Sequence, residues 1–232
     1  MPFTGSHPAA VLPFLGSAMP AAALVIGSMS PDLPLFVPMP YSVELSHELV
    51  GVATVDLAAG AALYLLWTVV LRPFLTDRIA PPLPDRPHRV VAGLGVGALT
   101  HVVWDSFTHA DGWAVRHLPA LQQHLGGLGV YEWAQYASGL FGLIVLTMWF
   151  RRRPPAARRI FSRPSACRVA GGLTVLGGVF GWWYGLRQPD PVRSAFFNSA
   201  TMGIDAGAAG ILVLAIARMV LVSRSRPDAD AS

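Results

Sequence analysis

Long apolar stretches separated by short polar connections run through most of the chain. Each stretch is close to or longer than the roughly 20 residues that an α-helix needs to cross a bilayer. The last one is the longest and carries Asp205 near its middle. The pattern predicts five transmembrane helices, over residues 50–71, 90–108, 133–150, 169–186 and 195–222.

An earlier apolar stretch, residues 8–26, is broken by Pro13 and Pro20, with small residues between them. Proline inside a helix removes a backbone hydrogen bond and interrupts or kinks the helix. We therefore expect two half-helices that form a re-entrant hairpin, with a kinked span as the alternative. No basic residue precedes Arg72, so the basic region of a secretory signal is missing and residues 1–30 are expected to stay in the mature protein.

These elements predict an all-α fold, a polytopic transmembrane helical bundle. We expect one integral membrane domain over residues 1–222, in which residues 1–150 carry the polar residues discussed below and residues 151–222 add two further membrane helices. The last segment, residues 223–232, is too polar to pack and is expected to be disordered.

The composition agrees with a membrane protein, because 53% of the residues are hydrophobic and only 13% are charged, whereas soluble domains carry about 25% charged residues. The formal net charge is +4, but the arginines occupy short connections rather than a face interleaved with aromatic residues. Such a distribution argues against nucleic-acid binding. Cys167 is the single cysteine, which excludes an internal disulfide.

The arginines divide unequally between the two predicted sides of the membrane. Only Arg116, Arg187 and Arg193 fall on one side. Positively charged connections stay on the cytoplasmic side, so the C-terminus is expected to be cytoplasmic and the protein to lie in the cytoplasmic (inner) membrane of a bacterium. The arginines of the richer side are Arg72, Arg78, Arg86, Arg89, Arg151, Arg152, Arg153, Arg158, Arg159, Arg163, Arg168, Arg218, Arg224 and Arg226.

His101, Asp105 and His109 recur at intervals of four in the segment HVVWDSFTH. Residues four apart lie on one face of a helix, so they predict a single polar stripe. Ionisable groups inside a membrane are costly and usually meet partners in the bundle interior. Imidazole nitrogen and carboxylate oxygen are ligands of zinc. A metal site and a helix packed through His–Asp hydrogen bonds without an ion are both compatible with this segment.

Three further polar positions border the first apolar segments: His7 in TGSHPAA, Asp32 in IGSMSPDLP and His47 in ELSHELVG. A local role as a turn or interfacial residue is the alternative for each. A hairpin over residues 8–28 returns His7 and Asp32 to the outer face, where the predicted topology also places His47 and the polar stripe. Six candidate ligands exceed the need of one zinc ion, so either two ions share a carboxylate or some residues orient others.

The motifs SHPA, GSMSPD, SHELVG and HVVWDSFTH resemble a bacterial family of multi-pass membrane proteins of unknown function, domain-of-unknown-function family 4184. That family is distantly similar to inner-membrane proteins described as metal-dependent hydrolases, which carry similar H, PD, H and HxxxD elements. The resemblance covers residues 1–150. It implies metal binding by His7, Asp32, His47, His101 and Asp105, with His109 as a looser match.

The expected function is hydrolysis of a lipid-linked or amphipathic ester or phosphoester near the outer face of the membrane. The expected cofactor is a divalent metal ion, and we expect zinc. Membrane lipids are the expected partners. Glu48 is the carboxylate closest in sequence to a candidate ligand, so it is a candidate general base. The alternatives are an ion or proton transporter that uses the same residues together with Asp56 and Asp205, and a non-catalytic membrane protein. Asp56 follows His47 by nine positions, which predicts the opposite side of that helix.

Overall fold

The computed structural model describes residues 4–76, 86–153 and 164–224. Helices make up nearly all of the ordered structure in these ranges, and the strands among them are the two-residue pair β1 (His124–Leu125) and β2 (Leu128–Gly129), joined antiparallel. The predicted all-α class is therefore confirmed. The chain forms two compact units, residues 1–64 with 83–158 and residues 65–82 with 159–232. The prediction of one membrane domain over residues 1–222 stays a prediction.

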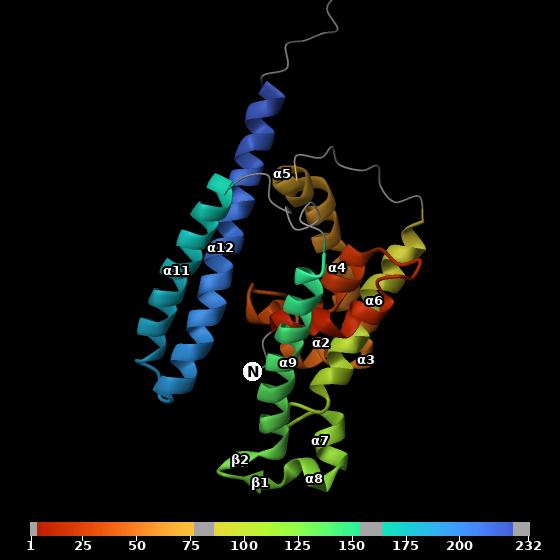
Figure 1. Cartoon of the computed structure of the whole chain (residues 1–232), viewed down its shortest axis with the longest axis vertical. Helices are drawn as coiled ribbons and strands as arrows, with labels where there is room; N and C mark the ends of the chain where they lie inside the picture. The colour runs from red at the N-terminus through yellow and green to blue at the C-terminus, as the bar shows by residue number, and fades with distance from the viewer. Residues whose placement is uncertain (1–3, 77–85, 154–163, 225–232) are drawn as a thin grey trace, which may run out of the picture. The chain divides into compact units, whose positions relative to one another are not determined.

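The first unit contains short helices around two long ones (Figure 1). Its long helices are α6 (Pro87–Asp105) and α9 (Val130–Arg151). Helix α4 (Val55–Leu66) begins in this unit and ends just past the boundary at Tyr64. The shorter elements are η1 (Thr4–Phe14), α1 (Ala21–Gly27), η2 (Ser30–Leu35), α2 (Val43–Ser46), α3 (Leu49–Ala53), α7 (Trp113–His117) and α8 (Pro119–Gln122).

Helices α1 and α6 approach each other closely because glycines face the contact. A Cβ atom at Gly27 would overlap the backbone of Leu94, and one at Gly97 would overlap the carbonyl oxygen of Leu24 and lie 2.6 Å from the backbone nitrogen of Ser28. Small residues of this kind allow the backbones of membrane helices to pack tightly. The contact continues into an apolar core that includes Ala23, Tyr64, Val90 and Leu94.

The N-terminal apolar stretch forms two separate short helices, as the broken pattern predicts. The 3₁₀-helix η1 contains Pro8 and Pro13 and is 11 residues long, whereas α1 has 7 residues. Neither is long enough to cross a bilayer as a single helix. The two ends of the stretch meet again, because the hydroxyl of Thr4 donates a hydrogen bond to Oδ2 of Asp32. The stretch thus turns back on itself as the expected hairpin does, and its re-entry into a membrane stays a prediction.

The second unit is built on a helical hairpin of α11 (Pro164–Gly185) and α12 (Pro191–Arg224), which lie side by side in Figure 1. Gly177, Gly181 and Gly185 of α11 face the backbone of α12 at distances that no larger residue could keep. The π-helical turn η3 (Trp67–Leu71) and α5 (Arg72–Thr76) complete the unit through contacts such as that of Phe74 with the core. Ser223 and Arg224 still belong to α12, and the rest of the predicted disordered tail lies outside the described residues.

Three helices among the described residues are long and apolar enough to cross a membrane, over Val55–Thr76, Val130–Arg151 and Ser194–Arg218. The prediction of five such helices is therefore wrong. The predicted spans 90–108 and 169–186 do form helices, α6 and α11, but their composition lowers their hydropathy. Helix α6 carries His88, Arg89, His101 and Asp105, and α11 carries the glycines Gly171, Gly172, Gly177, Gly178, Gly181 and Gly185.

Candidate metal centre

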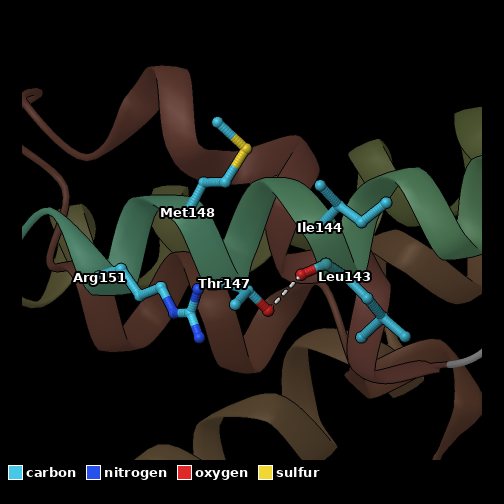
Figure 2. Close-up of a pocket in the computed structure, with 5 residues that line it drawn as sticks. All are labelled: Leu143, Ile144, Thr147, Met148 and Arg151. Carbon is cyan, nitrogen blue, oxygen red and sulfur yellow. Dashed lines mark hydrogen bonds between the residues drawn. The ribbon is translucent and has the colours of Figure 1, made fainter.

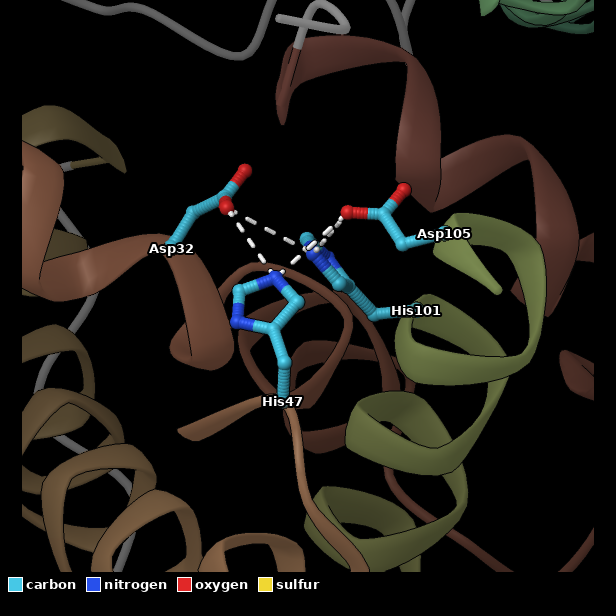
Figure 3. A group of neighbouring side chains, drawn as sticks. All are labelled: Asp32, His47, His101 and Asp105. Atoms are coloured by element: carbon cyan, nitrogen blue, oxygen red, sulfur yellow. Dashed lines mark ion pairs between the residues drawn. The ribbon is translucent and has the colours of Figure 1, made fainter. Parts of the chain in front are cut away.

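Four polar side chains from three segments of the first unit converge on one point. Asp32 lies in η2, His47 caps the C-terminus of α2, and His101 and Asp105 lie one turn apart at the end of α6. Figure 3 shows the four side chains pointing toward one another. One ligand atom from each lies within 4.8 Å of every other, so the group has the size of a metal site.

Nitrogen and oxygen atoms alternate around this group. Nε2 of His101 lies 3.5 Å from Oδ1 of Asp32 and 3.3 Å from Oδ2 of Asp105. Nε2 of His47 lies 3.6 Å and 3.4 Å from the same two oxygens. Zinc bonds of about 2.0–2.2 Å in a tetrahedral arrangement separate neighbouring ligand atoms by about 3.3–3.6 Å. The four spacings therefore fit a divalent cation at the centre.

Two atoms of the group are buried without a hydrogen bond. Among the described residues, Nε2 of His101 and Oδ2 of Asp105 have no hydrogen-bond partner, although the exposed fractions of these residues are 0% and 4%. A buried polar atom without a partner costs about 1–3 kcal/mol. A cation between these atoms would compensate that cost, which an apolar packing contact could not do.

Backbone carbonyls fix the orientation of both histidines. Nδ1 of His101 lies 2.8 Å from the carbonyl oxygen of Ser28, and Nδ1 of His47 lies 2.9 Å from that of Val43. Because a carbonyl oxygen only accepts, each Nδ1 carries the hydrogen of the neutral ring and each Nε2 directs its lone pair at the centre. Thr4 similarly occupies Oδ2 of Asp32 and leaves Oδ1 facing the histidines. Such outer contacts are typical of metal sites.

The charged and polar neighbours in the group shift the pKa values of Asp32 and His47. Burial by itself would raise the pKa of Asp32, but the neighbouring His101 and the hydroxyl of Thr4 outweigh it and hold that pKa below the usual value. Burial would lower the pKa of His47, but the Asp105 carboxylate outweighs it and raises that pKa. Asp32 is thus kept as an anion, which is the form that binds a cation.

His7 and His109 lie beside Asp105 but outside the group of four. Nε2 of His7 is 3.5 Å from Oδ1 of Asp105, and Nδ1 of His109 is 3.4 Å from Oδ2. Burial, followed by the nearby His101, lowers the pKa of His7 to about 4, so its ring is neutral at pH 7. The other ring nitrogen of His109 lies 3.3 Å from the side-chain nitrogen of Gln135.

The predicted helical stripe over His101, Asp105 and His109 is wrong for its last member. Helix α6 ends at Asp105, and His109 follows in a turn. The carbonyl of Ser106 accepts from the amide of Val115 instead of continuing the helix. The turn nevertheless keeps the ring of His109 within reach of Asp105, because the amide of His109 still donates to the Asp105 carbonyl at 3.1 Å.

Asp56 is a further buried carboxylate, on the helix α4 that follows His47 in the chain. The helix is interrupted at Thr54, whose backbone angles φ −127° and ψ −85° separate α3 from α4. Counting helical turns from His47 therefore fails. Asp56 is 1% exposed, and neither of its oxygens has a hydrogen bond within the described part of the chain. The sequence signal for this buried residue is a carboxylate within an otherwise apolar helical segment.

The candidate general base, Glu48, lies at the surface. Glu48 is exposed, and among the contacts of the described residues its carboxylate makes none with the cluster. Its assignment as a general base stays a prediction. Glu132 has a structural role, because its carboxylate accepts from the amide of Gly129 at 2.8 Å and caps α9.

A separate groove of about 280 Å³ runs along the surface of α9. Figure 2 shows its lining of Leu143, Ile144, Met148 and Arg151, together with Thr147, whose hydroxyl donates to the carbonyl of Leu143 at 2.7 Å. None of Asp32, His47, His101 and Asp105 lines it, and the hydroxyl of Thr147 already donates a hydrogen bond. The groove is an apolar helix face rather than a reaction site.

Comparison with protein families gives one finding that extends the resemblance seen in the motifs. A family model described as a domain of unknown function matches residues 1–216, so the match continues past residue 150 and includes both units. Searches of curated proteins and of solved structures found no match. By the extent of the family match, the chain belongs to the family described as domain of unknown function DUF4184.

Proposed function

We propose that this protein is a membrane-embedded hydrolase that depends on a divalent cation, zinc by preference, held by Asp32, His47, His101 and Asp105. The observation that carries the proposal is the alternation of two imidazole nitrogens with two carboxylate oxygens at spacings of 3.3–3.6 Å. Hydrogen-bonded packing alone would bring such atoms to about 2.7–3.2 Å. The observed spacing instead leaves room for an ion.

The chain's own residues would hold and orient the reacting groups. When bound, a divalent cation supplies a Lewis acid that acidifies water and polarises a carbonyl or phosphoryl oxygen. The carbonyls of Ser28 and Val43 keep both imidazoles in the coordinating tautomer. Glu48, which is exposed and adjacent in sequence to His47, is the proposed proton acceptor. His109, beside Asp105 and Gln135, is proposed to orient Asp105.

The membrane setting limits the proposed substrate. Three apolar helices of sufficient length support residence in a membrane, and the arginine distribution supports a bacterial cytoplasmic membrane with the C-terminus on the cytoplasmic side. The cluster would then lie toward the outer face. A lipid-linked or amphipathic ester or phosphoester suits that depth, because its apolar part can remain in the bilayer while the reacting group meets the cluster.

A second candidate function is ion or proton transport. The observation that favours it is Asp56, a buried carboxylate without a hydrogen bond in the described structure, on a candidate membrane span. Intramembrane acids of this kind line ion and proton routes in transporters. Asp205, in α12, belongs to the same hypothesis. Asp205→Asn is expected to leave hydrolysis unchanged if the protein is an enzyme and to abolish transport if it is a transporter.

Elemental analysis of the full chain, purified in mild detergent without chelators, tests the metal centre. We expect stoichiometric zinc in the native chain, loss of it in the double variant His101→Ala with Asp105→Ala, and retention in His124→Ala, which removes an exposed histidine outside the cluster. Asp32→Asn provides a milder variant if the double variant does not fold. A native chain that holds no metal after loading with zinc would refute the proposal.

The hydrolytic step needs a separate measurement. Zinc-loaded protein in detergent is incubated with alkyl-chain carboxylic esters and alkyl-chain phosphoesters that release a coloured alcohol. We expect turnover of one class that disappears in Asp32→Asn and persists in His124→Ala. Metal binding without any turnover of either class would retain the centre but contradict the hydrolase assignment.

A further inference from the structure

His7 is a buried side chain that the four-residue group leaves unexplained. Its exposed fraction is 0%, and neither Nδ1 nor Nε2 has a hydrogen-bond partner among the described residues. Its ring stacks on that of His101, with centroids 3.8 Å apart and planes inclined by 18°. Two unpartnered ring nitrogens inside the protein would each cost about 1–3 kcal/mol. A ligand bound to one of these nitrogens would remove part of that cost.

The atom that faces His7 is the second oxygen of Asp105. Oδ2 of Asp105 faces the nitrogens of His47 and His101, whereas Oδ1 lies 3.5 Å from Nε2 of His7 and 3.5 Å from the hydroxyl of Thr108. The two oxygens of one carboxylate thus serve different sets of donors. A separation of 3.5 Å between nitrogen and oxygen is longer than a hydrogen bond and matches the spacings within the first group.

We propose that the centre binds two divalent cations, with the Asp105 carboxylate bridging them and His7 as a ligand of the second. This inference rests on the proposed metal centre and extends it. Two-metal sites place their ions about 3.5–4 Å apart, which one bridging carboxylate can span. The rings of His7 and His101 are stacked, and their Nε2 atoms lie 3.5 Å and 3.3 Å from Oδ1 and Oδ2 of Asp105, respectively.

The second position is expected to bind more weakly than the first. Its donors from the described chain are Nε2 of His7, Oδ1 of Asp105 and the nearby hydroxyl of Thr108, so water or substrate must supply the remaining ligands. The charge balance points to the class of substrate. Two divalent ions carry four positive charges, against two negative charges on the ligands Asp32 and Asp105. The surplus favours an anionic phosphoester over a neutral carboxylic ester, because the incoming anion compensates it.

The number of bound ions tests this inference directly. The full chain in detergent is titrated with Zn²⁺ and analysed for metal content and by calorimetry. We expect two ions per chain in two steps, and one ion in His7→Phe, which keeps a ring that can stack on His101 but has no nitrogen. His124→Phe, at an exposed position, is the matched control and should retain two ions.

Electron paramagnetic resonance of the Mn²⁺-loaded native chain gives a readout that needs no variant. Two Mn²⁺ ions that share a carboxylate are spin-coupled, so a coupled spectrum is expected at saturation and an uncoupled one at a single equivalent. A native chain that saturates at one ion, or His7→Phe that still binds two, would overturn the second site and leave the proposed function intact. No bound ion at all would remove both proposals.

Discussion

Nδ1 of His101 lies 2.8 Å from the backbone carbonyl oxygen of Ser28, a residue 73 positions earlier in the chain. This contact fixes the imidazole so that Nε2 faces Asp32 and Asp105. It exists because α1 and α6 pack closely at their glycines. The orientation of a candidate ligand therefore depends on helix packing that lies outside the cluster.

Gly97→Ala is expected to weaken metal binding without touching a ligand. The added methyl would overlap the carbonyl of Leu24 and approach the amide of Ser28, so α1 must move and the Ser28 carbonyl must leave His101. We expect a loss of about 1–3 kcal/mol in the free energy of unfolding and a decrease of about 10–100-fold in zinc affinity. Chemical denaturation and calorimetry measure the two effects.

The matched control is Gly95→Ala on the same helix. Its Cβ atom would meet one methyl of Leu57 at 3.7 Å, an ordinary contact. Zinc affinity should remain at the native value. Equal zinc affinity in both glycine variants would contradict the role of the Ser28 carbonyl.

Thr4→Val removes the hydroxyl that donates to Asp32 while it keeps the shape of the side chain. Oδ2 of Asp32 then loses its partner in a site where the residue is 3% exposed, so we expect a loss of about 1–3 kcal/mol in unfolding free energy. Zinc affinity should fall as well, because Oδ1 is no longer held toward the histidines. Thr147→Val, which removes an exposed hydroxyl bonded within its own helix, should change neither quantity.

Zinc affinity is expected to decrease as the pH falls. Asp105 raises the pKa of His47 despite burial, so His47 holds a proton more tightly than a free histidine. A protonated imidazole cannot coordinate, and zinc must displace that proton. Affinity should therefore reach a plateau above the raised pKa and decline below it. Calorimetry in two buffers of different ionisation enthalpy would detect the released proton, and a pH-independent affinity without proton release would exclude His47 as a ligand.

Glu48→Gln is expected to separate catalysis from metal binding. If Glu48 accepts the proton during hydrolysis, the variant should lose about 10²–10⁴-fold in turnover and retain the native zinc content. Glu44→Gln, at another exposed acidic position of the same segment, serves as the control and should keep full turnover. Native turnover in Glu48→Gln would assign the base to a different group.

The sequence by itself determined the helical class, the break in the N-terminal stretch and six candidate ligands, of which Asp32, His47, His101 and Asp105 meet in one cluster. These features are local, because hydropathy, proline and the cost of burying an ionisable side chain depend mainly on the residue and its neighbours. Five spans were expected where three helices have the required length and hydropathy, since histidines, an aspartate and glycines inside α6 and α11 reduce their apolar character.

Only the tertiary structure decided how the polar groups face one another. The break at Thr54 starts a new helix that carries Asp56, and the end of α6 at Asp105 places His109 in a turn. The stacking of His7 on His101 and the contact of Ser28 with His101 join segments that are far apart in sequence. The lone pair of Nε2 in His101 points where it does because the Ser28 carbonyl holds Nδ1 of the same ring. That carbonyl is in place only when α1 and α6 have packed.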